Sequence, residues 1–222
     1  MRAFLIENGP WVVGALLLVE AVVLVGLLRL YRAGKTPLVL CMALVTAGLL
    51  YDGAVILLGR WLPEGLLRGL SVGRYLFHGL CMPLLLMISL YALGGEGKAV
   101  KAFWVIAAVL MGIGAVAGLL TKLQVVNFAG FIRCTGSDAT PKWADSYLSI
   151  LSVAMVIPLI LAGAWILIKK RGPFLFLSGL LMFAFSALGP ATGNIDLIFL
   201  IGMIGEALMV LCFLLHARRA RG

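Results

Sequence analysis

Three ionisable residues, an acid, a cation and a proton carrier, stand inside stretches of sequence that are otherwise apolar. Arg74 and His78 are four residues apart, so a helix would place both on one face, and Asp52 lies in the preceding apolar stretch. The planar guanidinium of arginine suits a carboxylate or a phosphate, and histidine exchanges a proton near neutral pH. Because ionisable residues in apolar segments usually face a cavity or each other, this spacing predicts a polar site. His78, Asp52 and Arg74 would be its catalytic residues.

A further set of residues is expected to bind the ligand of this site. The set is Arg74, Tyr51, Tyr75, Asn194, Glu206, Glu20 and Arg133. Glu20 and Glu206 fall near the middle of apolar stretches, where a carboxyl group is expected to be protonated or paired. Asn194 and Asp196 share a polar turn, from which they would close the rim of the cavity.

Each of these residues also has a purely structural explanation. Asp52 and Arg74 would then form an ion pair that joins two helices, or Arg74 would reach outward to lipid headgroups. His78 would satisfy a local carbonyl group, and Glu20 and Glu206 would bond to one another or to the backbone. The sequence leaves both explanations open.

The composition of the chain indicates a membrane protein. Of its 222 residues, 63% are hydrophobic and 12% are charged, whereas soluble domains have roughly 25% charged residues. The apolar runs are continuous, which predicts helices rather than the alternating strands of a barrel. We expect an all-α bundle of seven transmembrane helices in a single domain of residues 1–222. The expected spans are about 11–31, 37–58, 74–93, 102–120, 146–168, 174–188 and 197–215.

The basic residues predict the orientation of the bundle. Eleven lie on one side of the expected spans: Arg29, Arg32, Lys35, Lys98, Lys101, Lys169, Lys170, Arg171, Arg218, Arg219 and Arg221. Seven lie on the other: Arg2, Arg60, Arg68, Arg74, Lys122, Arg133 and Lys142. Since lysine and arginine accumulate on the cytoplasmic side, the N-terminus is expected outside and the C-terminus in the cytoplasm. The expected location is the plasma membrane or the bacterial inner membrane.

Several classes of function are excluded or disfavoured. The net charge of +9 does not indicate nucleic-acid binding, because the basic residues lie at helix ends and would contact lipid headgroups. The four cysteines form no Cys-x-x-Cys pair, and the two histidines are too far apart for a histidine-cluster metal site. No lysine falls inside an expected span, which excludes a retinal Schiff base. We therefore expect neither a metal nor a cofactor.

The connecting segments carry weaker signals. Residues 59–73 predict a short amphipathic helix in the membrane interface, and residues 121–145 predict a long outer loop. A basic turn followed by proline occurs at Pro37 and again at Pro173. Spans one to three and five to seven would then form two parallel copies around a linking fourth helix, an arrangement found in some transporters.

Three segments together resemble a known family. They are Tyr51-Asp52-Gly53, then Arg74-Tyr75 with His78 and Pro83, then Gly193-Asn194 followed by Gly205-Glu206. In these the chain is similar to a group of small bacterial seven-helix integral membrane proteins of undetermined function, some of which are named phospholipid phosphatases. The family pattern has asparagine where Gly53 stands. A histidine-type lipid phosphatase also needs two histidines and a lysine-arginine motif in outer loops, which this sequence lacks.

Three functions remain open at this point. The first is an outward-facing cavity that binds or processes a lipid-like or amphiphilic small molecule. Arg74 would hold an anionic headgroup, His78 would donate or accept a proton and Asp52 would orient it, with help from Tyr147. The second is a proton-coupled small-solute transporter that uses Glu20 and Glu206. The third is a receptor-like or partner-binding subunit that uses the long outer loop.

Overall fold

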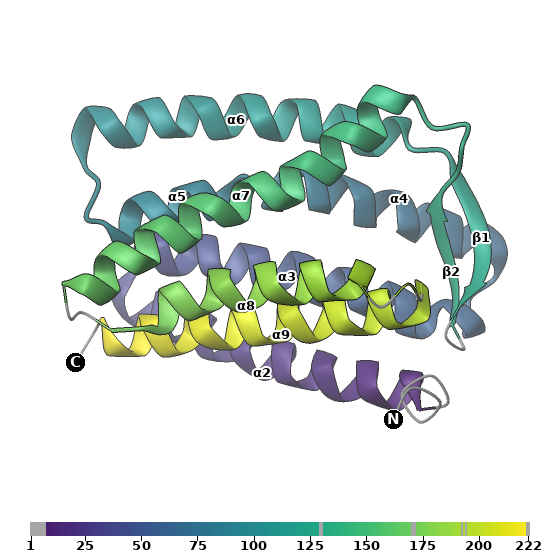
Figure 1. Cartoon of the computed structure of the whole chain (residues 1–222), viewed down its shortest axis with the longest axis horizontal. Helices are drawn as coiled ribbons and strands as arrows, with labels where there is room; N and C mark the ends of the chain where they lie inside the picture. The colour runs from purple at the N-terminus through teal and green to yellow at the C-terminus, as the bar shows by residue number, and fades with distance from the viewer. Residues whose placement is uncertain (1–7, 129–130, 170–171, 192, 194, 221–222) are drawn as a thin grey trace.

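The computed structural model describes residues 8–128, 131–169, 172–191, 193 and 195–220. In chain order the elements are α2 (Gly9–Gly34), α3 (Pro37–Leu58), η1 (Gly59–Trp61), α4 (Glu64–Cys81), α5 (Leu84–Ala92), α6 (Gly97–Leu120), β1 (Leu123–Phe128), β2 (Phe131–Gly136), α7 (Lys142–Ile168), α8 (Phe174–Ala191) and α9 (Ile195–Arg219). The helices run roughly along one common direction, and the two strands cover one end of the bundle (Figure 1).

Six helical segments among the described residues are long and apolar enough to cross a membrane. They are Gly9–Gly34, Pro37–Trp61, Glu64–Ala92, Gly97–Leu120, Lys142–Ile168 and Phe199–Arg219, and a shorter apolar helix covers Phe174–Ala187. The chain is thus a helical, multi-pass membrane protein. The expected count of seven spans, their orientation and the internal repeat stay predictions.

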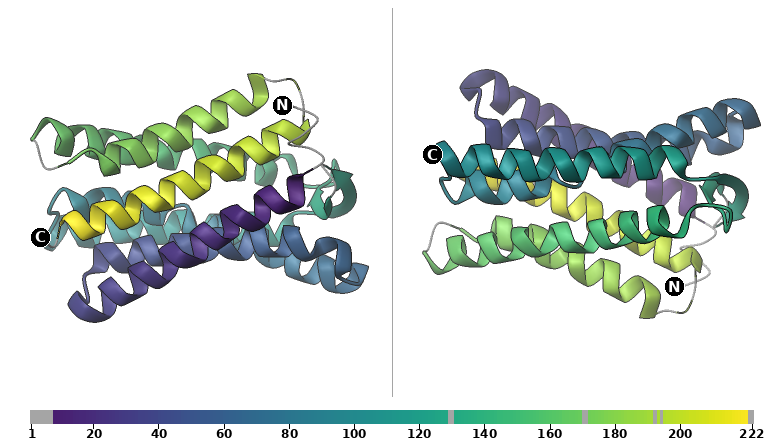
Figure 2. Two further views of the ribbon diagram at one scale, coloured as in Figure 1. Left: turned by 90° about the horizontal axis from the view of Figure 1, so that it is seen from below. Right: turned by 90° about the horizontal axis from the view of Figure 1, so that it is seen from above.

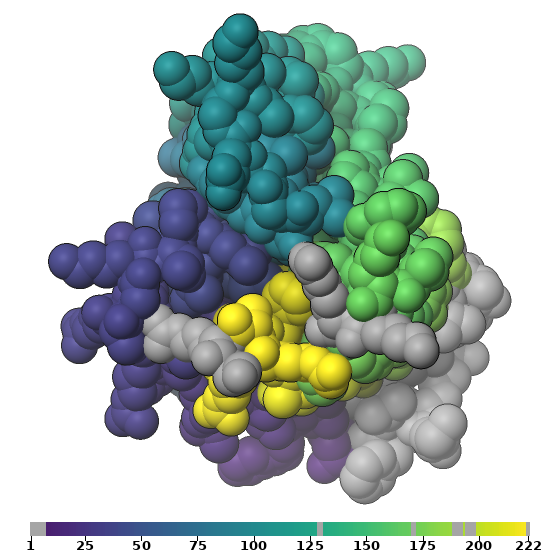
Figure 3. All heavy atoms as spheres, turned by 90° about the vertical axis from the view of Figure 1, so that its left-hand side faces the viewer, coloured from purple at the N-terminus to yellow at the C-terminus, as the bar shows by residue number. Residues whose placement is uncertain are grey.

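The two ends of the bundle differ in composition. The hairpin end carries β1 and β2 and the start of α2, whereas α9 finishes at the opposite, basic end (Figures 1 and 2). Figure 3 looks onto the basic end, where the turns α2–α3 and α5–α6 surround the yellow end of α9. Exposed cations cluster there: Arg29, Arg32, Lys35, Lys98, Lys101, Lys169, Arg218 and Arg219.

Apolar side chains fill the centre of the bundle and also cover much of its outside. The main buried cluster includes Met42, Met87, Ile88, Leu159 and Phe213. Outward-facing apolar residues form belts along three helices: Leu18, Val22 and Val25 on α2, Val105, Val109 and Val116 on α6, and Ile150, Ile157 and Leu161 on α7. Such continuous apolar surface suits contact with hydrocarbon and not with water.

Helices α4 and α6 pack backbone against backbone. A Cβ atom on Gly114 would lie 2.6 Å from the carbonyl oxygen of Gly79, and one on Gly118 would lie 2.7 Å from that of Tyr75. Small residues allow such close approach between membrane helices, as the Gly- and Ala-rich sequence of the fourth span indicates. The adjoining face of α4 carries Arg74 and His78.

The third span differs from its prediction. The expected interfacial helix at residues 59–73 is wrong, because α4 begins at Glu64 and continues without a break through Arg74. Pro63 caps this helix and the acidic Glu64 suits its positive N-terminal end. The helix stops at Cys81 since Pro83 has no N–H to continue the ladder, and α5 resumes at Leu84.

The long loop expected at residues 121–145 contains an antiparallel β-hairpin instead, so the all-α expectation was incomplete. Its register runs from Leu123↔Gly136 to Phe128↔Phe131. The segment is rich in Val, Phe and Ile, which favour strands. The hairpin packs on the helices: Phe131 is buried against α2, α3 and α9, and Cys134 against Val55 and Leu67. Pairing and packing therefore order a segment whose sequence shows no clear alternation.

Candidate functional site

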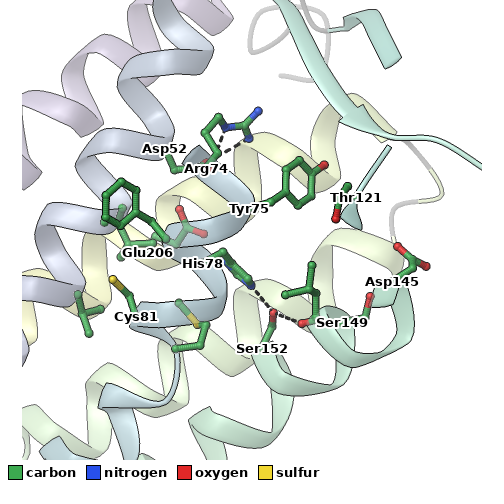
Figure 4. A pocket seen from close by; sticks show the side chains of 16 residues that line it. Asp52, Arg74, Tyr75, His78, Cys81, Thr121, Asp145, Ser149, Ser152 and Glu206 are labelled. Atoms are coloured by element: carbon green, nitrogen blue, oxygen red, sulfur yellow. Dashed lines mark hydrogen bonds and ion pairs between the residues drawn. The ribbon is translucent and has the colours of Figure 1, made fainter. Parts of the chain in front are cut away.

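A cavity of about 300 Å³ lies near the hairpin end, between α3, α4, α7 and α9 (Figure 4). Its volume is at the lower limit of ligand pockets, which span roughly 300–1,000 Å³. The polar residues that line it are Asp52, Arg74, Tyr75, His78, Thr121, Asp145, Ser149, Ser152 and Glu206. Arg74, His78 and Cys81 stand on one face of α4, since they recur every three or four residues.

Asp52 and Arg74 form a two-pronged ion pair between α3 and α4. Arg74 donates from Nε to Oδ1 of Asp52 at 2.8 Å and from Nη2 to Oδ2 at 3.3 Å. A third donation, from Nη1 to the carbonyl oxygen of Cys134 at 3.1 Å, connects the pair to β2. Only 9% of the Arg74 side chain is exposed, against 34% of Asp52. The pair therefore joins three elements and also forms part of the cavity wall.

His78 and Ser152 meet across the cavity. The Nε2 atom of His78 lies 2.7 Å from the hydroxyl oxygen of Ser152, and that hydroxyl donates to the carbonyl oxygen of Leu148 at 2.8 Å. In one tautomer of His78 the serine hydroxyl donates to Nε2; in the other, where the serine hydrogen is directed to Leu148, Nε2 carries a hydrogen and donates it to Ser152. The other ring nitrogen, Nδ1, is then the acceptor. This bond links α4 to α7 and fixes the orientation of the imidazole ring.

The charges that line the cavity are mainly acidic. Asp52, Asp145 and Glu206 contribute carboxyl groups, and Arg74 contributes a guanidinium. Asp145 is exposed at the rim, whereas Glu206 stands deeper, on α9. Because Asp52 already neutralises Arg74, Asp145 at the rim favours a ligand that carries a positive group, and Glu206 adds to this only where it is ionised.

A second cavity of about 240 Å³ adjoins the first. The two share Leu49, His78, Met82, Ser152 and Glu206 as walls. The rest of the second lining is Leu85, Val153, Val156, Met182, Phe183, Ser186, Ala187 and Met209. Polar groups thus concentrate at one end of the combined space and apolar groups at the other.

Two of the expected binding residues have other roles in the structure. Tyr51 does not line the cavity: its hydroxyl donates to the carbonyl oxygen of Leu70 at 2.9 Å, and its ring packs edge-on against Phe77. Glu20 is only 1% exposed and lies outside the lining residues. Neither of its carboxylate oxygens has a hydrogen-bond partner within the described part of the chain.

Two more of the expected residues, Arg133 and Tyr147, do not line the cavity. Arg133 is on β2, with its guanidinium 4.6 Å from the ring centre of Phe199. Burial, and then the positive charge of Arg74, lower the pKa of Arg133. Tyr147 donates to the carbonyl oxygen of Leu110 at 2.7 Å. Asn194 lies outside the described residues, as does the side chain of Asp196.

Sequence reasoning missed the contribution of α7 to the site. Asp145, Ser149 and Ser152 line the cavity from the hairpin end of this helix. Their spacing of four and three residues places them on one face of an otherwise apolar helix. That spacing was the available signal. Thr121, at the end of α6, has no comparable sequence signal.

No group of three or more His, Cys, Asp or Glu side chains is placed to hold a metal ion in the part of the chain that the structure describes. The four cysteines are free thiols, and Cys41, Cys134 and Cys212 are buried. In comparisons with known proteins, the chain matches no family model and no curated protein shows significant similarity. The resemblance to the bacterial seven-helix family therefore stays a prediction.

Proposed function

We propose that this protein binds a lipid-like amphiphile in the cavity at the hairpin end. The observation that carries the proposal is the convergence of Asp52, Arg74, His78 and Glu206, from three helices, on one space of about 300 Å³. The hairpin end would face the outside and the basic end the cytoplasm, with seven spans in the plasma or inner membrane. The ligand would reach a polar site enclosed by helices whose outer surfaces contact lipid.

The charges of the lining favour a zwitterionic headgroup. The anionic part of such a headgroup would accept hydrogen bonds from Arg74 at the inner side of the cavity. Its cationic part would face Asp145 at the rim. A purely anionic headgroup would meet the carboxyl groups of Asp52 and Asp145 and one guanidinium that is already paired, so it would bind less well.

His78 would exchange a proton with the bound headgroup. Its ring is held by Ser152 through Nε2, and in the tautomer that carries its hydrogen on Nε2 the Nδ1 atom would accept a proton from a ligand. Where the ligand is turned over, His78→Ala is expected to abolish turnover while folding and ligand binding persist. Full turnover of an identified substrate by this variant would exclude a catalytic role for His78.

The binding proposal is tested with the full-length protein in lipid nanodiscs. Native mass spectrometry would compare binding of phosphatidylethanolamine, which is zwitterionic, with that of phosphatidylglycerol, which is anionic. Arg74→Gln is expected to weaken phosphatidylethanolamine binding by about tenfold, the effect of losing one hydrogen bond from a charged donor. The matched control is Arg68→Gln, because Arg68 stands on the same helix but is exposed and outside the cavity.

Asp145→Asn provides an independent test, since Asp145 is exposed and its loss should leave folding intact. This variant is expected to lose preference for phosphatidylethanolamine over phosphatidylglycerol. Thermal unfolding of each variant checks that it is folded. The proposal would be wrong if the wild-type protein showed no lipid preference, or if folded variants of both residues kept the wild-type preference.

A second candidate function is proton-coupled transport, which Glu20 favours. This carboxyl group is buried between helices and lacks a hydrogen-bond partner among the described residues, as expected for a group that takes up a proton. Gly53 lies beside Leu17 of α2 and Met203 of α9. Glu20 follows Leu17 by one helical turn, and Glu206 follows Met203 by one helical turn. The two carboxyls thus lie at one level of the bundle. Loss of solute-coupled proton uptake in liposomes on Glu20→Gln and Glu206→Gln would support this function.

A further inference from the structure

Helices α7 and α8 are in close contact along one half of their length and are separated along the other half. Toward the basic end the helices touch closely: a Cβ atom on Gly163 would overlap the backbone of Phe176, and one on Gly179 would lie 2.7 Å from the side chain of Ile160. Toward the hairpin end the two helices diverge (Figure 1). Pro158 stands between these halves of α7, where it removes one helical hydrogen bond and favours a bend.

The second cavity lies where α7 and α8 diverge. Val153 on α7 and Phe183 on α8 both line it, yet they are 50% and 44% exposed. The cavity therefore reaches the outer surface of the bundle between these two helices. Val153 lies about 17 Å along α7 from its start at Lys142, at about 1.5 Å per residue. At that depth the surface of a spanning helix contacts hydrocarbon, not water.

We infer that the second cavity holds the hydrocarbon chain of the ligand, and that the ligand enters sideways from the bilayer between α7 and α8. This inference rests on the proposed function and specifies its substrate class as a membrane lipid with a zwitterionic headgroup. The two cavities adjoin at His78, Ser152 and Glu206, which line both. A single lipid would place its headgroup on one side of these residues and its chain on the other. Leu85, Val156 and Met209 supply buried apolar contacts for its chain.

The gap between α7 and α8 lies in the apolar part of the molecule, which suits entry of a lipid and not of a soluble ligand. A soluble ligand would need a path that opens to water, past Asp145 and Ser149 at the hairpin end. A lipid already in the bilayer would instead pass its chain between Val153 and Phe183 without leaving hydrocarbon. Its headgroup would then move along the polar wall toward Arg74.

The first test narrows the gap between α7 and α8. Val153→Trp in the full-length protein is expected to weaken binding of long-chain phosphatidylethanolamine by tenfold or more. Binding of glycerophosphoethanolamine, the same headgroup without acyl chains, should be unchanged. The matched control is Ile150→Trp, because Ile150 is 66% exposed one turn earlier on α7 and does not line the cavity. Equal binding of the long-chain lipid by the wild type and folded Val153→Trp would overturn the inference.

The second test needs no substitution. A phosphatidylethanolamine with a photoreactive group on its acyl chain should crosslink to Leu85 and Met209, which are each 1% exposed and out of reach of surrounding lipid. Crosslinks confined to the outward belt of α6, such as Val109, would overturn the inference. If Leu85 and Met209 were labelled while Arg74→Gln bound lipid normally, the chain site would stand and the headgroup proposal would fail.

Discussion

Two adjoining faces of α4 make different kinds of contact. On one side Gly79 meets Gly114 of α6, and no side chain separates the two backbones. On the other side Arg74 and His78 face a cavity, and the bond from His78 to Ser152 bridges the gap to α7. Glycine permits close contact because nothing projects from its Cα atom. Polar side chains hold the helices apart because each one needs a partner and room to reach it.

This difference separates packing from function within one helix. The glycine side determines where α4 lies, and the polar side determines what the cavity can bind. Substitutions on the first side should therefore change the stability of the whole bundle. Substitutions on the second should cost less stability and change the local properties of the cavity.

The largest effect is expected from Gly114→Leu. The new side chain would push into the backbone of α4, and overpacking of this kind costs about 3 kcal/mol in the free energy of unfolding. The midpoint of thermal unfolding in detergent measures the loss. Gly112→Leu is the matched control, because a Cβ atom there has nothing within 4 Å. Equal stability of the two variants would show that the close contact does not position α4.

A smaller loss in the free energy of unfolding is expected from Asp52→Ala, because this variant leaves the buried guanidinium of Arg74 without its carboxylate partner. Breaking a fully buried pair costs about 3–5 kcal/mol, and because Asp52 is 34% exposed we expect about 2 kcal/mol. Urea or thermal unfolding measures it. Glu64→Ala breaks the exposed pair with Arg68 and should cost less than about 1 kcal/mol. If the two losses were the same, the Asp52–Arg74 pair would behave as a surface pair.

Ser152→Ala removes the partner of His78 across the cavity. One hydrogen bond contributes about 1 kcal/mol, so the loss in the free energy of unfolding should be near that value. Ser178→Ala is the comparison, because the hydroxyl of Ser178 bonds within its own helix, to the carbonyl oxygen of Leu175 at 2.7 Å. Ser178→Ala should cost less than Ser152→Ala. The reverse order would mean that the bond between α4 and α7 does not stabilise the bundle.

The smallest and most local effect is expected from Tyr75→Phe. The hydroxyl of Tyr75 accepts the N–H of Gly136 at 2.8 Å, so its loss should free that amide of the hairpin. Hydrogen exchange at Gly136 should accelerate about fivefold, which corresponds to about 1 kcal/mol. Tyr51→Phe serves as the control, since Tyr51 bonds to Leu70 and not to the hairpin. Equal acceleration in both variants would contradict a specific bond from Tyr75.

The positions of the helices could be predicted because a bilayer restricts the choices of the backbone. Every buried N–H and C=O must be paired within the segment, so a long apolar run becomes a helix. The run from Pro37 to Leu58 was predicted with the bounds that α3 has. The predicted first residue was wrong where a helix begins before its apolar stretch, as at Glu64 and Lys142. Hydropathy does not report how far a helix extends into the polar region.

Part of the candidate site was visible in the sequence for a similar reason. A charged residue in an apolar segment is costly, so Asp52, Arg74 and Glu206 were conspicuous. Ser149 and Ser152 were not, because serine is common in membrane helices and bonds its own backbone at little cost. Tyr51 and Glu20 were expected to bind ligand on the same grounds as the lining residues, and only their packing separates them from the cavity.

The sequence alone determined that the chain forms apolar helices, and that Arg74 and His78 share one helix face, because both follow from local spacing and from the solvent. Only the tertiary structure decided that this face meets Ser152, and that α7 and α8 part beside the second cavity. Those facts depend on how glycines such as Gly79 and Gly163 seat one helix against another. Contacts between residues far apart in the chain leave no periodic signal, so they appear only when the helices are packed together.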